Sequence, residues 1–159
     1  MSDDSEELEE RQVRDRIADR LTRAFSSVPK PAPPLTVGGS ALADDVEDVL
    51  AGKDADALTA DDARELRGDL RLLTRPALRY YLPALLRVVL LGEPYVDGLD
   101  EFTFNLLVPP EKPEQLRGFE EQLNLDAAQR AAIGAYVAWY SQGESFLPGR
   151  DRALAYWRT

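Results

Sequence analysis

A dense apolar run at residues 77–91 constrains the fold of this chain more than any other feature. Only two of its fifteen residues are charged, which is too few for a helix at the protein surface. Thr74 can cap a helix there, and Pro76 is tolerated in a first turn because its missing N–H would have no partner in that position. We therefore predict a buried central helix, and we expect Pro83 to kink or break it by removing one backbone hydrogen bond.

Several other segments combine helical spacing of apolar residues with helix-start signals. Thr59 with Asp62, and Asp126 with Gln129, have the three-residue spacing of a capping box. Helices are expected over residues 5–26, 41–51, 59–67, 126–142 and 152–157. Together with the central helix, they predict an all-α fold: a single compact domain of about six helices around the Pro-kinked one.

Residues 102–108 have the least helical composition in the chain. Phe102, Thr103 and Phe104 precede three apolar residues and two prolines, which suits a short extended segment. A strand without a partner is marginally stable, so a packed loop or a short helix is equally consistent with this sequence.

The domain organisation follows from a change of composition after the first predicted helix. Residues 1–28 form a charged amphipathic helix, with apolar residues every four or five positions from Leu8 onward. Residues 29–40 are rich in Pro and Gly and predict a stiff connector. Residues 41–159 are expected to form the helical globular domain. The first helix can dock on this domain or reach out to another chain.

The chain is acidic, with 29 Asp and Glu against 19 Lys and Arg, and its net charge is −10. This excess disfavours binding to nucleic acid and to anionic membranes, but it permits a basic protein partner. The acidic N-terminus does not resemble a targeting signal, and the most apolar stretch, residues 82–91, is only about half a membrane span. We expect a soluble, cytoplasmic protein.

The sequence contains no His and no Cys. Histidine is the usual general base and a common metal ligand, and cysteine supplies thiolate nucleophiles and soft metal ligands. Chemistry that depends on either residue is therefore excluded. We expect no catalytic residue, no metal site and no cofactor, and we favour binding over catalysis.

The string Arg79-Tyr80-Tyr81, just before Pro83, is the most distinctive in the chain. Adjacent side chains point about 100° apart on a helix, so at least one tyrosine should be buried. A kink beside them can open a small pocket lined by a phenol and a freed carbonyl. The other interpretation is core packing, with the hydroxyl bonded to that carbonyl or to an acid.

Three acids, Asp97, Asp100 and Glu101, cluster near the turn at Gly98. Carboxylates suit Ca²⁺ or Mg²⁺, and paired carboxylates suit acid–base catalysis. The spacing does not match an EF-hand loop, and turns collect aspartates for backbone reasons. Binding of a metal ion is therefore not expected here.

Two aromatic pairs lie near the C-terminus, at residues 139–140 and 156–157. They can pack together and hold the last helix in place. If one pair is exposed, its tryptophan, Trp139 or Trp157, is the best candidate for an interface anchor, because Trp and Tyr dominate binding hot spots.

The stretch LLTRPALRYYLPALL, residues 72–86, is followed by Phe119, Leu123 and the segment Gln129-Arg-Ala-Ala-Ile133. This pattern resembles a family of small bacterial proteins, the domain of unknown function numbered 6714. The resemblance covers about residues 60–140. It implies a compact, mostly helical fold but no activity, so it assigns no functional residues.

These features favour a non-catalytic protein-interaction module, either of the immunity or antitoxin type or a subunit of a complex. The expected partner is a protein, of basic charge, or a second copy bound through the N-terminal helix. The alternative is a small-ligand-binding protein or a carboxylate-based enzyme. Its pocket would lie at the kinked central helix, between Arg79, Tyr80, Tyr81 and the acids at 97–101.

Overall fold

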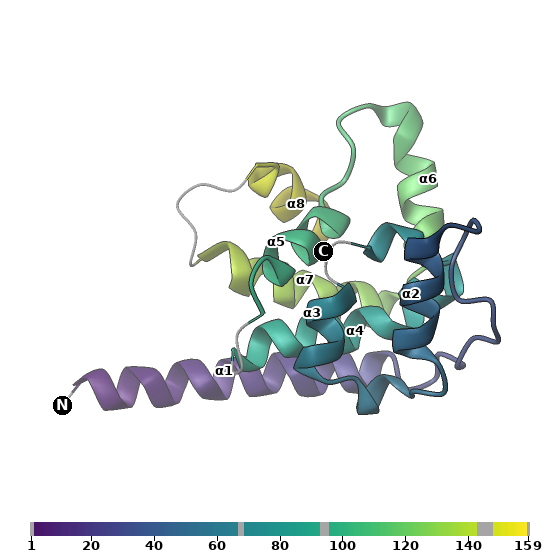
Figure 1. Cartoon of the computed structure of the whole chain (residues 1–159). Coiled ribbons are helices and arrows are strands. Elements are labelled where there is room, and N and C mark those ends of the chain that lie inside the picture. The colour runs from purple at the N-terminus through teal and green to yellow at the C-terminus, as the bar shows by residue number, and fades with distance from the viewer. Residues whose placement is uncertain (1, 67–68, 93–95, 143–147, 159) are drawn as a thin grey trace.

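The chain folds as an all-α protein. The computed structural model describes residues 2–66, 69–92, 96–142 and 148–158, and these residues form eight α-helices and no β-strand (Figure 1). The helices are α1 (Ser2–Ala24), α2 (Ala41–Leu50), α3 (Ala60–Leu66), α4 (Arg75–Leu91), α5 (Leu99–Leu107), α6 (Pro113–Leu123), α7 (Ala127–Gln142) and α8 (Arg150–Trp157). Two 3-10 turns, η1 (Ala55–Ala57) and η2 (Leu70–Leu72), precede α3 and α4.

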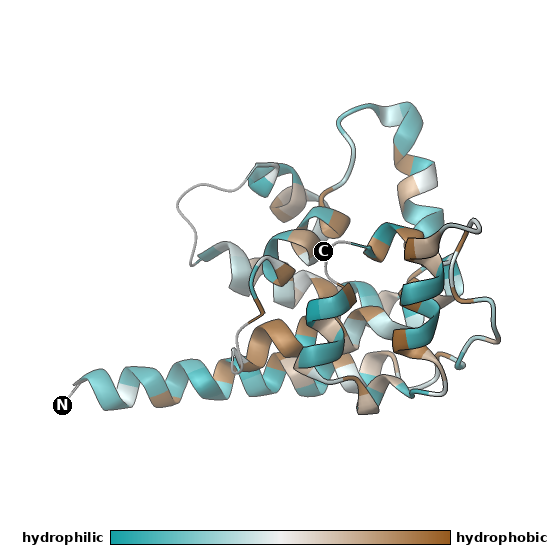
Figure 2. Ribbon diagram, in the orientation of Figure 1, coloured by the Kyte–Doolittle hydropathy of each residue, from teal (hydrophilic) through white to brown (hydrophobic). Residues whose placement is uncertain are grey.

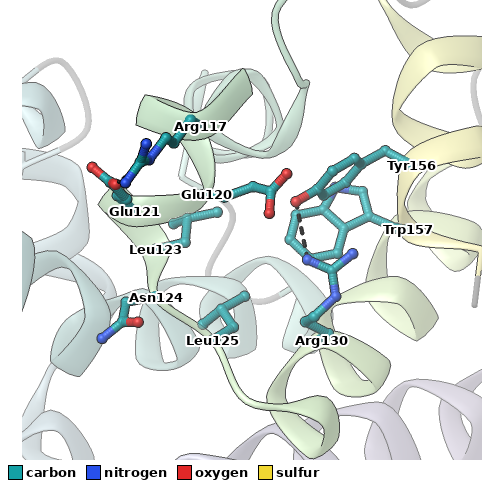
Figure 3. Close-up of a pocket in the computed structure, with 9 residues that line it drawn as sticks. All are labelled: Arg117, Glu120, Glu121, Leu123, Asn124, Leu125, Arg130, Tyr156 and Trp157. Carbon is teal, nitrogen blue, oxygen red and sulfur yellow. Dashed lines mark hydrogen bonds and ion pairs between the residues drawn. The ribbon is translucent and has the colours of Figure 1, made fainter. Parts of the chain in front are cut away.

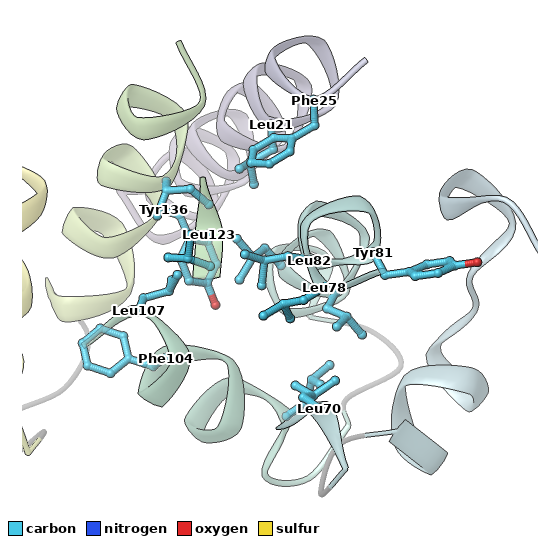
Figure 4. Packing of buried hydrophobic residues seen from close by; sticks show 14 of the residues in the cluster. Leu21, Phe25, Leu70, Leu78, Tyr81, Leu82, Phe104, Leu107, Leu123 and Tyr136 are labelled. Atoms are coloured by element: carbon cyan, nitrogen blue, oxygen red, sulfur yellow. The ribbon is translucent and has the colours of Figure 1, made fainter. Parts of the chain in front are cut away.

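Helix α4 packs against α1, α3, α5 and α6. Nine of its residues are buried, and Figure 4 shows two of them, Leu78 and Leu82, within the cluster of apolar side chains. The helix continues through Pro83, so the predicted break is wrong, whereas the kink stays a prediction. The turns on both sides of the proline are packed, and this packing outweighs one missing hydrogen bond. Nowhere in the described residues is a helix both long enough and apolar enough to cross a membrane.

Two predicted helix starts are confirmed by their hydrogen bonds. At the start of α4, the Thr74 hydroxyl accepts a 3.3 Å hydrogen bond from the Ala77 N–H. Before α7, the Gln129 N–H donates to the Asp126 carboxylate at 2.8 Å, and the Asp126 N–H donates to the Gln129 amide oxygen at 3.0 Å. The second start is a reciprocal capping box, which satisfies two backbone donors that a helix start leaves free.

The predicted capping box at Thr59 and Asp62 is also present, at the start of α3. The Asp62 N–H donates to the Thr59 hydroxyl at 3.1 Å, and the Thr59 N–H donates to the Asp62 carboxylate at 3.0 Å. Lys53 donates to the same carboxylate at 2.5 Å. Burial raises the pKa of Asp62, but the hydrogen bonds from Lys53 and Thr59 outweigh it, so the pKa lies below its usual value.

Of the alternatives left open for residues 102–108, the short helix is confirmed and the extended segment is wrong, because these residues belong largely to α5. Thr103 is buried and its hydroxyl donates to the Leu99 carbonyl at 2.8 Å, so the polar group of this β-branched residue is satisfied inside the helix. Phe104 and Leu107 complete the buried face of α5. Tertiary packing here outweighs local composition.

The predicted count of about six helices is too low, because α6 was not expected and α5 was only one of the alternatives left open for residues 102–108. The signals for α6 are present in the sequence. Pro113 occupies its first turn, and Asn124 ends it in the left-handed conformation, at φ 46°. The apolar residues Leu116, Phe119 and Leu123 lie on one face at helical spacing.

The Pro- and Gly-rich connector, residues 29–40, contains no helix in the structure. It is fixed to the body through an isolated antiparallel bridge between Thr36 and Leu73. The Glu47 carboxylate of α2 accepts hydrogen bonds from the backbone of Leu35 and Thr36. The connector therefore leads the chain from the end of α1 along the body to α2 by specific contacts.

Helix α1 lies along α4 and α7, and its first half extends past the rest of the molecule (Figure 1). Leu21 is fully buried, whereas Leu8, which belongs to the same predicted apolar stripe, is 57% exposed. We call residues 3–12 the acidic arm and residues 13–24 the docked half. The two halves of one continuous helix therefore have different environments.

Candidate functional site

The predicted pair Tyr80 and Tyr81 packs against the segment between α2 and α3. Tyr81 is fully buried, and its hydroxyl donates a 2.7 Å hydrogen bond to the Lys53 carbonyl. The Tyr80 hydroxyl accepts a 3.1 Å hydrogen bond from the Ala55 N–H. Burial raises the pKa of Tyr81 to about 12, so this phenol remains a protonated donor at neutral pH. Both hydroxyls are thus engaged with backbone groups.

Arg79 points toward α7, away from that segment. Its Nη2 donates to the side-chain oxygen of Gln129 at 3.4 Å, and its Nε is buried without a hydrogen-bond partner. Gln129 is fully buried and also donates to the Ala24 carbonyl at 3.2 Å. These contacts join α4, the start of α7 and the last residue of α1. They give Arg79 and Gln129 a role in holding the three helices together.

The predicted acids are separated from the tyrosines. Asp100 accepts a 2.7 Å hydrogen bond from the Tyr140 hydroxyl, between α5 and α7, while Asp97 and Glu101 are exposed. Figure 4 shows Tyr81 on the opposite side of α4 from Phe104 of α5 and Tyr136 of α7. In the described parts of the chain, no three acidic side chains come close enough together to hold a metal ion.

The two candidate tryptophans have different environments. Trp157 is 4% exposed, and its indole N–H donates to the Leu107 carbonyl at 2.7 Å. Trp139 is only partly buried, and its ring lies 5.8 Å from that of Tyr136. Of the two predicted anchors, Trp139 is therefore the one that a partner can reach without local unfolding.

Trp139 lines a groove between α1 and the end of α7. The groove has a volume of about 540 Å³ and is lined by Glu6, Glu9, Glu10, Val13, Trp139, Tyr140 and Gln142. Acidic side chains from α1 form one side, and the aromatic rings of α7 form the other. A cationic side chain placed there would lie beside carboxylates and the Trp139 indole, and both kinds of group attract cations.

The acidic arm supplies the charge of this groove. Residues 3–12 contain six acids and one arginine, whereas residues 13–24 contain two acids and four arginines. The arm is correspondingly hydrophilic over most of its length (Figure 2). All of the residues of the arm are exposed. Negative charge is thus concentrated on the half of α1 whose side chains are exposed.

The groove residues on α1 were not predicted from the sequence, although Trp139 was. The groove forms only when α1 lies against α7, two helices separated by about one hundred residues. The sequence carries one signal for the groove. Acidic residues are concentrated in the first half of the first predicted helix, and arginines in its second half.

Comparisons with protein-family models, with curated proteins and with solved structures found no match. The resemblance to the domain of unknown function numbered 6714 therefore stays a prediction.

Proposed function

We propose that this chain is a non-catalytic protein-interaction module that binds a basic segment of a partner protein in the cytoplasm. The observation that carries the proposal is the groove between the acidic arm and Trp139. An immunity- or antitoxin-type protein, or a subunit of a complex, would use such a surface. The groove presents carboxylates and an aromatic ring together, and arginine is the residue best suited to both.

The charge of the arm favours a basic partner over a second copy of this chain. Two arms brought together would each contribute six acids and one arginine, so they would repel each other. The only large apolar side chain of the arm is Leu8, which offers little area for a symmetric helix pair.

The alternative function, a ligand pocket at the central helix, has less support. It needs Arg79, the two tyrosines and the acids at 97–101 around one cavity. Tyr81 and Tyr80 are bonded to the backbone at Lys53 and Ala55, and Asp100 is bonded to Tyr140. Because these side chains already have hydrogen-bond partners within the protein, they favour a role in stabilising the fold over ligand binding.

The two tryptophans provide a direct test, because each contributes one indole N–H resonance. A helical peptide with arginine at every fourth position should shift the Trp139 indole and the amides of the arm in an NMR titration. The Trp157 indole, bonded to Leu107, should not move. A peptide of the same length with glutamine in place of each arginine serves as the ligand control.

A matched pair of triple variants separates the groove from net charge. Neutralising Glu6, Glu9 and Glu10 to glutamine should weaken peptide binding at least about tenfold, or ~1.4 kcal/mol. Changing the exposed acids Asp44, Asp45 and Asp48 of α2 to asparagine removes the same total charge away from the groove. Equal losses in both variants would refute the groove as the binding site.

A further inference from the structure

A second hollow, of about 330 Å³, lies between α6, the turn into α7 and the end of α8 (Figure 3). Its apolar lining comes from Leu123 and Leu125 and from the rings of Tyr156 and Trp157. Its charged lining consists of two arginines and two glutamates: Arg117, Glu120, Glu121 and Arg130. The volume is at the lower end of the range found for small-molecule sites.

Arg130 is held at this hollow by aromatic rings. Its guanidinium carbon lies 4.8 Å from the ring centroid of Tyr156 and 5.4 Å from that of Trp157. Its Nη1 donates to the Tyr156 hydroxyl at 2.9 Å. Within the described residues it forms no ion pair with a carboxylate. The result is a pre-positioned guanidinium whose charge is not neutralised by an acidic side chain.

Glu120 is the acidic counterpart on α6. It too forms no ion pair in the parts of the chain that are described, whereas its neighbour Glu121 is paired with Arg117 at 3.0 Å. Figure 3 shows the Glu120 carboxylate and the Arg130 guanidinium both directed toward the Tyr156 ring. One cation and one anion therefore approach the same hollow without pairing with each other.

From this arrangement we propose that the hollow binds a free α-amino acid with an apolar side chain. The ligand carboxylate would bond to the Arg130 guanidinium, and the ligand ammonium would lie against Glu120. The apolar side chain would pack on Leu125, which is half-buried, because Leu123 is only 3% exposed. A phosphate or a dicarboxylate is disfavoured because it would meet Glu120, and a simple cation is disfavoured because it would meet Arg130.

Removing one ligand charge at a time tests this proposal. Titration with L-leucine should shift the Trp157 indole resonance, and L-phenylalanine should do so as well. N-acetyl-L-leucine lacks the ammonium and L-leucinamide lacks the carboxylate, so each should bind at least about tenfold more weakly than leucine. Equal binding of leucine and both analogues, or no shift with either amino acid, would overturn the proposal.

Two single variants assign the charges to their residues. Glu120→Gln should abolish the preference for leucine over its N-acetyl form, and Arg130→Gln should abolish the preference over leucinamide. Arg64→Gln changes an exposed arginine of α3 that is paired with Asp61 and does not line the hollow, so it should leave both preferences intact. Glu120 is exposed, so its variant remains informative if loss of the Arg130 stacking impairs folding. Unchanged preferences in the Glu120 variant would refute the assignment.

Discussion

The two halves of α1 share one helix but are stabilised by different interactions. The docked half, residues 13–24, buries Ile17 and Leu21 against the body, and it carries four arginines and two acids. The acidic arm, residues 3–12, is exposed throughout and carries six acids and one arginine. Because an isolated helix of this length is marginal in water, the arm depends on the docked half for its conformation.

This difference shows how a continuous helix can divide structural and binding roles. The docked half contributes its free energy to the folded state, so its substitutions should change stability. The arm contributes little to stability and is therefore free to carry charge that a folded core would not tolerate. Substitutions that separate the two effects test the division.

The largest expected effect comes from truncating one leucine in each half. Leu21→Ala removes a fully buried side chain and should lower the free energy of unfolding by about 2–5 kcal/mol. Leu8→Ala, the same change at a 57% exposed position, should stay within about 0.5 kcal/mol of the parent. Urea unfolding of both variants gives the comparison, and similar losses would mean that the arm is packed in solution.

The sequence predicted the docked half better than the arm, for a physical reason. Helical spacing identifies an apolar stripe, and it correctly placed Leu21 in the core. The same spacing also placed Leu8 on the apolar stripe, although Leu8 is exposed. A local pattern does not show how far along α1 the rest of the protein covers the helix. The length of α1 that is covered depends on its contact with α7, a helix that is distant from α1 in the sequence.

A smaller loss of stability is expected at Gln129 of α7, whose side chain bonds to Ala24, the last residue of the docked half. Gln129→Ala leaves the Ala24 carbonyl and the Asp126 N–H without their present partners, so it should cost about 1–3 kcal/mol. Gln12→Ala, at an exposed position in the arm, is the matched control and should be nearly neutral. Chemical denaturation measures both, and an equally neutral Gln129→Ala would show that water replaces these bonds.

The candidate site was predictable only in part. Thr59, Thr74 and Asp126 were found at helix starts because capping depends on residues a few positions apart. Trp139 was found because aromatic residues are recognisable in sequence, but whether it or Trp157 is accessible depends on the packing of α8. The Arg79–Tyr81 string and the acids at 97–101 are close in the chain, yet α4 separates Tyr81 from α5 (Figure 4).

The smallest expected effect lies within the arm, and it is a gain in helix stability rather than a loss. Glu6 and Glu10 are both acidic and four residues apart, so Glu6→Gln should relieve repulsion and stabilise the arm by about 0.2–0.5 kcal/mol. The gain should appear as stronger amide protection of residues 7–11 in hydrogen exchange, while protection around Leu21 stays constant. High salt screens repulsion over these distances, so it should abolish the gain.

Asp3→Asn makes the same change of charge in the first turn of α1, where an acid also interacts favourably with the helix dipole. That interaction is typically about 0.3–1 kcal/mol, which is enough to cancel the relieved repulsion. Asp3→Asn should therefore give no gain in protection. If it protects the arm as strongly as Glu6→Gln does, net charge alone limits the arm. If neither variant changes protection and salt has no effect, contacts between the arm and the rest of the protein must stabilise the arm. Both halves of α1 would then be stabilised by packing.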